Sequence, residues 1–216
     1  MSFRNILFDL DGTLTDPKEG IFNSILYALR EMNIEAPKEE TLLSFIGPPL
    51  HDSFKHHFSL TDEEADEAVE LYRVYFPEKG MYENELYEGI PELLSSVKAA
   101  GKKIYLATSK PKVYATEILR HFGLLPFFDG ISGPELDGTR NHKAEVIEFL
   151  IQVYGIVPEE SIMIGDRLHD MKGASTHNIK AVGVTYGYGS VGELQENGAW
   201  KLVDSVEELG DLLMEN

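Results

Sequence analysis

Cysteine is absent from the 216 residues of the sequence. Disulfide bonds, zinc sites with thiolate ligands and a cysteine nucleophile are therefore excluded. Long apolar segments are absent as well, since no run approaches the roughly 20 residues that a membrane-spanning helix needs. The first four residues also lack the charged-then-apolar order of a signal peptide. We expect a cytoplasmic protein that has no membrane partner.

Basic residues are few, with 19 Lys and Arg against 37 Asp and Glu, which gives a formal net charge of −18. Proteins that bind nucleic-acid polymers need a basic surface that displaces counterions from the phosphates. The composition therefore argues against a nucleic-acid polymer as partner. It is compatible with a small phosphorylated substrate, because surface charges more than about 10 Å apart are largely screened at 0.1 M salt. The oligomeric state is left open.

The pattern of apolar residues predicts an α/β fold. Short apolar segments predict six strands, at residues 4–9, 102–108, 127–132, 161–166, 181–186 and 201–203. Amphipathic segments between them predict helices at residues 90–100, 111–122, 143–154 and 168–178. Strands that alternate with helices in this way form a parallel sheet that is covered on both faces.

One region departs from the alternation. Residues 17–85 contain only helical patterns, at residues 19–32, 38–45, 50–58 and 62–76. This is more helix than one crossover connection uses. We therefore interpret residues 16–85 as an inserted helical subdomain, and residues 1–15 and 86–216 as the α/β core. The alternative is an ordinary helical decoration of the sheet.

Acidic residues follow two of the predicted strands at the point where each strand ends. The segment NILFDLDGTLTD places Asp9 and Asp11 after the first strand, and GDRLHD places Asp166 and Asp170 after the fourth. In open α/β sheets, ligands bind outside the carboxyl ends of the strands. A single aspartate there would indicate a helix cap or a turn. Two pairs indicate a bound cation, because a buried carboxylate is costly unless it is paired or bound to one.

Another predicted strand ends in TSKP, which contains Thr108, Ser109 and Lys110. Hydroxyl and ammonium groups complement phosphate oxygens. Oxygen ligands from separate carboxylates suit Mg²⁺, which usually keeps one or two carboxylates and several waters. The strand ends together are compatible with a hard divalent cation and with the oxygens of a phosphate group.

A second LDGT occurs at residues 136–139, after Gly133 and Pro134 and not after an apolar strand. An Asp-Gly pair in such a setting typically forms a turn. We interpret Asp137 as a turn residue in a loop that leads to Lys143.

The motifs and their order resemble those of the haloacid dehalogenase (HAD) superfamily. DLDGT at residues 9–13 matches the first motif of the family, Thr108 the second, Lys143 the third and GDRLHD at residues 165–170 the fourth. The resemblance covers essentially the whole chain, and the helical insertion is similar to the type 1 cap of the phosphoglycolate phosphatase-like branch. It implies a Rossmann-like core and a Mg²⁺-dependent phosphomonoesterase that acts on a small-molecule phosphate ester.

The resemblance also implies the roles of the acidic residues. Asp9 would be the nucleophile that forms an aspartyl-phosphate, and Asp11 would donate a proton to the leaving oxygen and later activate water. The Asp9 and Asp166 carboxylates and the Asp11 carbonyl would hold Mg²⁺. Asp170 would support the metal directly or through water.

The remaining implied residues would bind the phosphoryl group. Thr108 and Lys143 would contact its oxygens, and Lys143 would offset the repulsion between a carboxylate nucleophile and a dianionic phosphate. Gly12 would let the backbone turn closely past the site. Ser109 and Lys110 are further candidates for contacts with the substrate.

The substrate is predicted from shorter segments. IGPPL, LDGTRNHK and GDRLHD together are similar to the branch that is commonly assigned as 5′-nucleotidase-like. A nucleoside 5′-monophosphate is therefore the first choice and phosphoglycolate the second. A sugar phosphomutase is an alternative enzyme. A phospho-acceptor signalling module of the receiver type is an alternative of another class, although such modules lack a cap and a DxD on the first strand.

Four weaker candidates have plain structural alternatives. Residues 44–50 (SFIGPPL) predict either a substrate-selecting loop or a helix-breaking linker. Arg73 and Arg167 are each either a residue that contacts a substrate anion or an ordinary basic residue of a helix. His56 and His57 point in different directions on a helix, which predicts a surface pair and not a metal site.

Overall fold

The computed structural model describes residues 3–215, which form two compact units. The core unit comprises the residues up to Asp16 and from Leu86 onward, and the helical unit comprises Pro17–Glu85. Asp16 thus belongs to the core unit, whereas the sequence pattern assigns it to the insertion. The first two residues and the last one of the predicted core lie outside the described residues. The chain passes between the units at β2 (Thr15–Asp16) and β3 (Glu85–Leu86), which pair as a separate two-stranded sheet.

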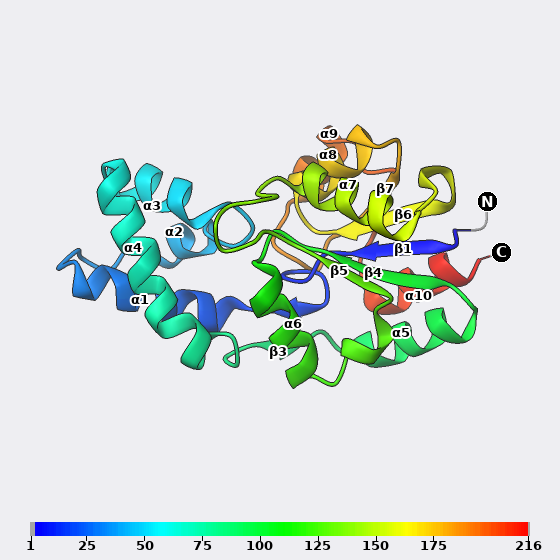
Figure 1. Cartoon of the computed structure of the whole chain (residues 1–216), viewed down its shortest axis with the longest axis horizontal. Coiled ribbons are helices and arrows are strands. Elements are labelled where there is room, and N and C mark those ends of the chain that lie inside the picture. The colour runs from blue at the N-terminus through cyan, green and yellow to red at the C-terminus, as the bar shows by residue number, and fades with distance from the viewer. Residues whose placement is uncertain (1–2, 216) are drawn as a thin grey trace. The chain divides into compact units, whose positions relative to one another are not determined.

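The core unit contains a six-stranded parallel sheet with the strand order β5-β4-β1-β6-β7-β8 (Figure 1). β1 lies near the centre, between β4 and β6. The predicted parallel α/β fold is confirmed, with small differences at the strand ends. The strands are β1 (Asn5–Phe8), β4 (Lys103–Ala107), β5 (Gly130–Ser132), β6 (Ser161–Gly165), β7 (Lys180–Val184) and β8 (Lys201–Val203).

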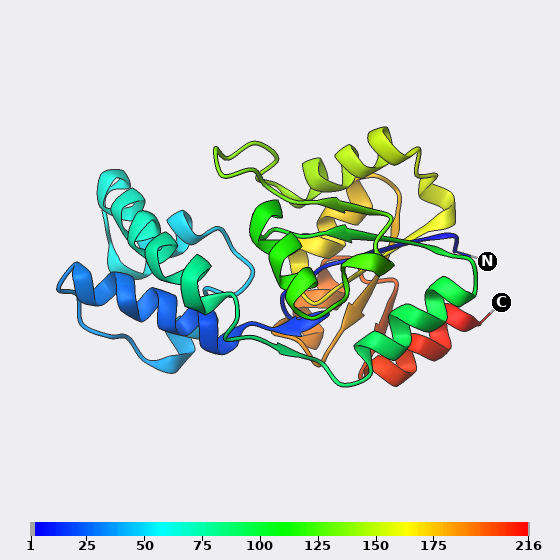
Figure 2. The ribbon, with the colours of Figure 1, turned by 60° about the horizontal axis from the view of Figure 1, so that its bottom comes forward.

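Helices cover both faces of this sheet. They are α5 (Ile90–Ala99), α6 (Lys112–His121), α7 (Lys143–Tyr154), α8 (Leu168–Thr176), α9 (Val191–Glu196) and α10 (Val206–Met214). α5 and α10 pack against each other on one face, and α7 and α8 lie on the other (Figures 1 and 2). Successive side chains of a strand point to opposite faces, and Ile6, Leu7 and Phe8 are all fully buried. Both faces of β1 therefore contribute to the hydrophobic core.

The helical unit is built from helices and their connecting loops, and Glu85 of β3 is its last residue. Its helices are α1 (Lys18–Glu31), α2 (Glu39–Leu43), α3 (Leu50–Phe58), α4 (Asp62–Tyr75) and a π-helical turn (Phe76–Gly80). α4 begins at a capping box, in which the Glu64 amide donates to Thr61 Oγ1 and the Thr61 amide donates to Glu64 Oε2. None of the helices within residues 3–215 combines the length and apolar character needed to cross a membrane.

The sheet brings polar residues together at one edge. β1, β4 and β6 are neighbouring parallel strands, and in their register Phe8 is opposite both Leu106 and Ile164. Asp9, Thr108 and Asp166 follow directly after the last residues of these three strands. Because the strands are parallel and in this register, all three residues lie at the same carboxyl edge.

Candidate active site

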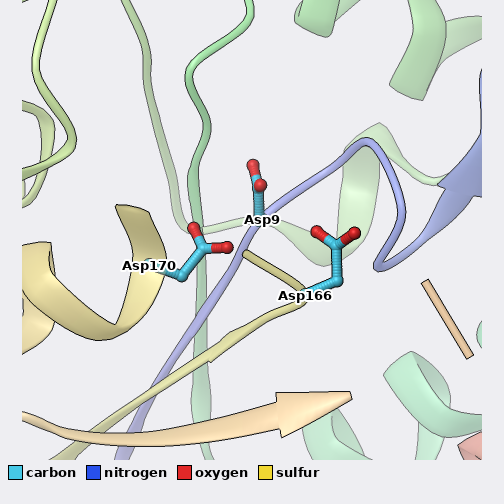
Figure 3. Close-up of side chains that lie close together, drawn as sticks. All are labelled: Asp9, Asp166 and Asp170. Atoms are coloured by element: carbon cyan, nitrogen blue, oxygen red, sulfur yellow. The ribbon is translucent and has the colours of Figure 1, made fainter. Parts of the chain in front are cut away.

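Three carboxylates gather at this edge of the sheet. Asp9, Asp166 and Asp170 are buried, and each offers an oxygen within 4.8 Å of the oxygens of the other two. Figure 3 shows the side chains approaching one another from the end of β1, the turn after β6 and the first turn of α8. Within residues 3–215, no other cluster of Asp, Glu and His side chains has a spacing that suits a metal ion.

Local backbone geometry positions two of these carboxylates. The Asp9 amide donates to the Ile164 carbonyl at 2.9 Å, which extends the contact between β1 and β6 by one residue. The Arg167 amide donates to Asp170 Oδ2 at 3.1 Å, as part of a capping interaction at the start of α8. A Cβ atom built at Gly165 would lie 2.2 Å from Asp170 Cγ. The Asp170 side chain thus occupies space that only a glycine leaves open.

Asp166 is enclosed by two glycine-containing turns. Gly12 has φ +78°, and a Cβ atom there would lie 2.2 Å from Asp166 Oδ2. A Cβ atom at Gly187 would lie 2.4 Å from Asp166 Cβ. The Tyr188 amide donates to Asp166 Oδ2 at 2.7 Å, whereas Oδ1 is buried and has no hydrogen-bond partner among the described residues. An orphaned carboxylate oxygen beside two further carboxylates fits a divalent cation.

Lys143 is the cation that the chain itself supplies. Its Nζ lies 3.0 Å from Asp9 Oδ1 and 2.8 Å from Asp170 Oδ1. Nζ also donates to the Ala107 carbonyl at 2.9 Å, and the residue is only 5% exposed. A Cβ atom at Gly173 of α8 would lie 2.8 Å from Lys143 Cγ, so the glycine leaves room for the lysine stem. Three acceptors therefore fix the position of the ammonium group.

Burial controls the protonation of these groups. It raises the pKa of Asp166 well above its usual value, and the charges of Asp170 and Asp9 raise it further. Burial also raises the pKa of Asp170 to about 6, against the opposing charge of Lys143. Burial alone would lower the pKa of Lys143, but the two carboxylates beside it raise that pKa above the usual value. Burial and mutual repulsion thus disfavour the ionised forms of Asp166 and Asp170, and a divalent cation would stabilise those forms.

A second ion pair lies next to the cluster. Lys110 Nζ is 2.8 Å from Asp11 Oδ2, and both side chains are largely buried. Burial raises the pKa of Asp11, although the charge of Lys110 opposes the shift. A raised pKa suits a carboxyl group that both gives and accepts a proton.

The predicted phosphate-binding residues Thr108 and Ser109 directly precede Lys110, after the end of β4. Thr108 is 1% exposed, and its hydroxyl accepts the Lys110 amide at 3.1 Å. Ser109 is half-buried. The amine of Lys110, which the sequence suggests as a substrate contact, is held by the Asp11 carboxylate.

The weaker candidates have partners that explain their positions. Arg167 Nε donates to Glu193 Oε1 at 2.9 Å, and Arg73 forms an ion pair with Glu70 at 2.8 Å. Thr139 donates its amide to Asp137 Oδ1 at 2.9 Å, so the second LDGT forms the predicted turn.

His56 and His57 meet edge to face, with ring centroids 5.0 Å apart. His57 Nε2 lies 2.9 Å from Ser44 Oγ. Neither histidine belongs to the one metal-compatible cluster found within residues 3–215.

Reasoning from the sequence missed the loop after β7. Besides its amide contact with Asp166, Tyr188 donates its hydroxyl to Asp16 Oδ1. The Tyr186 hydroxyl donates to the Thr13 carbonyl at 3.0 Å. The available signal is YGYGS at residues 186–190, a glycine-rich segment that follows a predicted strand at the ligand-binding edge.

Comparison with known proteins gives one family. The model described as haloacid dehalogenase-like hydrolase matches residues 6–184. A 5′-nucleotidase of Pseudomonas aeruginosa is 48% identical over 195 residues, which cover 90% of this chain and 88% of that protein. The tyrosine-protein kinase PtkA of Mycobacterium tuberculosis is 38% identical over 184 residues, which cover 85% of this chain but 62% of that protein. A crystal structure described as a predicted phosphatase from Clostridium acetobutylicum is 44% identical, with a TM-score of 0.95 and coverage of 100% of both chains.

Proposed function

Because the chain belongs to the haloacid dehalogenase-like hydrolase family and is a phosphatase of that family, we propose that it hydrolyses a small phosphate monoester through an aspartyl-phosphate on Asp9. The observation that carries the proposal is the placement of Asp9, whose carboxylate lies 3.0 Å from Lys143 and within the same cluster as Asp166 and Asp170. This arrangement provides a nucleophile, a cation to accept phosphoryl charge and a set of oxygen ligands.

The reaction divides into two displacements. In the first, a carboxylate oxygen of Asp9 bonds to phosphorus while the bond from phosphorus to the leaving oxygen breaks, and Asp11 gives its proton to that oxygen. In the second, a water molecule loses a proton to Asp11 and attacks phosphorus, which breaks the bond to Asp9 and releases phosphate. The second step restores both carboxyl groups.

The remaining residues stabilise charge. Lys143 is positioned beside Asp9 and would contact the phosphoryl oxygens, together with the hydroxyl of Thr108. Asp9, Asp166 and the Asp11 carbonyl would hold Mg²⁺, with Asp170 in support. When bound, the ion would neutralise charge on the phosphoryl oxygens. The orphaned, buried oxygen of Asp166 supports this ligand set.

We further propose that the substrate is a nucleoside 5′-monophosphate and that the reaction takes place in the cytoplasm. The printed activity of the Pseudomonas aeruginosa relative supports this choice, as do the sequence segments at residues 46–50 and 136–143. The helical unit would then act as a cap that selects the leaving group, with residues 44–50 as its selecting loop. Phosphoglycolate is the second choice.

Phosphate release from a panel of esters tests the proposal. The panel contains nucleoside 5′-monophosphates, phosphoglycolate, hexose phosphates and p-nitrophenyl phosphate, each with and without Mg²⁺. Asp9→Asn should lose activity by a factor on the order of a thousand or more, as removal of a nucleophile does elsewhere. Asp137→Asn is the matched control, because it makes the same change in the second LDGT, and it should retain full activity.

Each part of the proposal has its own contrary result. Near-normal turnover by Asp9→Asn would overturn the assignment of Asp9 as the nucleophile. Turnover that is independent of divalent ions would overturn the proposed requirement for Mg²⁺. A single phosphorylation without repeated turnover would indicate a phospho-acceptor module. A kcat/KM for phosphoglycolate or a hexose phosphate above that of every nucleotide would overturn only the proposed choice of a nucleotide as substrate.

A further inference from the structure

Tyr188 contacts two functionally different parts of the core unit. Its amide donates to Asp166 Oδ2 at 2.7 Å, and its hydroxyl donates to Asp16 Oδ1. Asp16 ends β2 and is the last residue of the core unit before the helical unit begins. A single residue thus joins a carboxylate of the acidic cluster to the point where the chain leaves the core.

The loop around Tyr188 has little freedom to move independently of the cluster. A Cβ atom at Gly189 would lie 1.9 Å from the Asp166 carbonyl oxygen. A Cβ atom at Gly187 would lie 2.3 Å from the Gly12 carbonyl oxygen and 2.4 Å from Asp166 Cβ. Both glycines therefore pack directly against the turns that carry the acidic residues. A displacement of Tyr188 would displace Asp166 with it.

The two oxygens of Asp166 have different environments. Oδ2 accepts the Tyr188 amide, while Oδ1 is buried and lacks a hydrogen-bond partner among the described residues. The amide thus orients the carboxylate so that Oδ1 is left for a cation. Groups that orient a ligand in this way tune the affinity of a metal site.

We propose that Tyr188 is a positioning residue, which links Asp16 to Asp166 and so couples the exit of the chain from the core to the affinity of the acidic cluster for a divalent cation. The inference rests on the proposed role of Asp166 as a metal ligand. The hydroxyl bond to Asp16 holds the loop where the amide reaches Oδ2. Because coupling between sites is reciprocal, cation binding should in turn restrain the segment around Asp16.

Calorimetric titration of the full chain with Mg²⁺ alone tests the link. Tyr188→Phe removes only the hydroxyl and keeps the amide, and Asp16→Ala removes the acceptor. We expect each variant to bind Mg²⁺ about tenfold more weakly, the lower end of the effect of groups that orient metal ligands. The double variant should bind no more weakly than either single variant, because both changes remove the same bond.

Thr185→Val is the matched control. The Thr185 hydroxyl donates to Asp204 Oδ1 at 2.8 Å, so the variant removes the same kind of bond from the same loop but none that reaches Asp16. Its Mg²⁺ affinity should equal that of the unsubstituted protein. An equal loss of affinity in this control would show general loosening of the loop and would overturn the coupling.

Hydrogen exchange gives a readout that does not depend on activity. In the unsubstituted protein, Mg²⁺ should slow exchange of the amides of residues 13–16, and this slowing should disappear in Tyr188→Phe. Unchanged affinity in Tyr188→Phe, or additive losses in the double variant, would overturn the inference while leaving the proposed function in place. Failure of the unsubstituted protein to bind Mg²⁺ would overturn the proposed cofactor and this inference together.

Discussion

The ammonium group of Lys143 lies 2.8 Å from a carboxylate oxygen of Asp170. The same group lies 3.0 Å from Asp9, the proposed nucleophile. One side chain therefore supports the buried acidic cluster and also stands where phosphoryl charge would arrive. Its removal should affect both the stability of the protein and the chemistry.

The first prediction concerns Lys143→Met. Without the ammonium group, Asp9 and Asp170 become buried carboxylates with no cation, and such a loss typically costs about 3 kcal/mol or more. We expect the metal-free protein to lose about this much free energy of unfolding near neutral pH, as measured by urea denaturation, and to lose phosphatase activity. Mg²⁺ should restore part of the stability but not the activity.

Lys103→Met is the control for loss of a cation that pairs at the surface. Lys103 lies 3.0 Å from Asp129 but is exposed, so its removal should change stability little. A stability of Lys143→Met equal to that of this control would show that Lys143 does not hold the cluster together.

The second prediction concerns Asp11→Asn and p-nitrophenyl phosphate. This ester has a good leaving group, so the first displacement needs little help from an acid. Asparagine cannot accept the proton of the attacking water, and the aspartyl-phosphate should therefore accumulate. Mass spectrometry after acid quenching should detect one added phosphoryl group in Asp11→Asn and none in Asp9→Asn. Rapid turnover without a trapped intermediate would remove Asp11 from the role of base.

The third prediction concerns pH. The pKa of Asp170 is raised to about 6 in the folded protein, from a usual value of 3.8. A group whose pKa is raised by folding stabilises the folded state below its unfolded pKa, and this contribution is lost as pH rises through the folded value. The metal-free protein should therefore lose stability from this group between about pH 4 and about pH 6.

Mg²⁺ should reverse this dependence, because it binds the deprotonated carboxylates. The rise in Tm that Mg²⁺ produces should be small at about pH 5 and larger at about pH 7.5. Asp166→Asn should abolish the rise at both pH values. It should also leave the metal-free protein as stable as before or more stable, since burial and the charges of Asp170 and Asp9 disfavour an ionised Asp166. A rise of equal size at both pH values would contradict the proposed ligands.

The part of the site that sequence could predict follows from the sheet. Asp9 and Asp166 each end an apolar segment, and parallel strands bring such ends to one edge. The neighbouring positions of β1 and β6 then place these two aspartates together. No such rule predicts the link from Tyr188 to Asp16, because it is a side-chain hydrogen bond between residues 172 positions apart.

The shortest helices and strands are also hard to predict from the sequence. α9 spans Val191–Glu196 and β2 spans only Thr15–Asp16, which is too little sequence for a periodic pattern. α10 (Val206–Met214) is longer and has a capping serine at Ser205, whose hydroxyl accepts the Glu208 amide. That helix could have been predicted from its cap and its apolar residues.

The last prediction compares the two copies of Asp-Gly-Thr. Gly12 and Gly138 have similar left-handed conformations, with φ +78° and +86°. An alanine in this conformation costs about 1 kcal/mol at either site. A Cβ atom at Gly138 would have no neighbour within 4 Å, whereas one at Gly12 would lie 2.2 Å from Asp166 Oδ2. An alanine therefore causes similar backbone strain at both positions, but its methyl group collides with Asp166 only at position 12.

Gly138→Ala should lose about 1 kcal/mol of stability and keep its Mg²⁺ affinity and kcat. Gly12→Ala should lose more stability, because the Asp166 carboxylate or the turn must shift to admit the methyl group. It should also bind Mg²⁺ more weakly, since the oxygen that accepts the Tyr188 amide is the one displaced. Calorimetric titration and thermal unfolding of both variants separate these effects. Equal Mg²⁺ affinity in the two variants would mean that close packing of Gly12 against Asp166 does not set the geometry of the metal site.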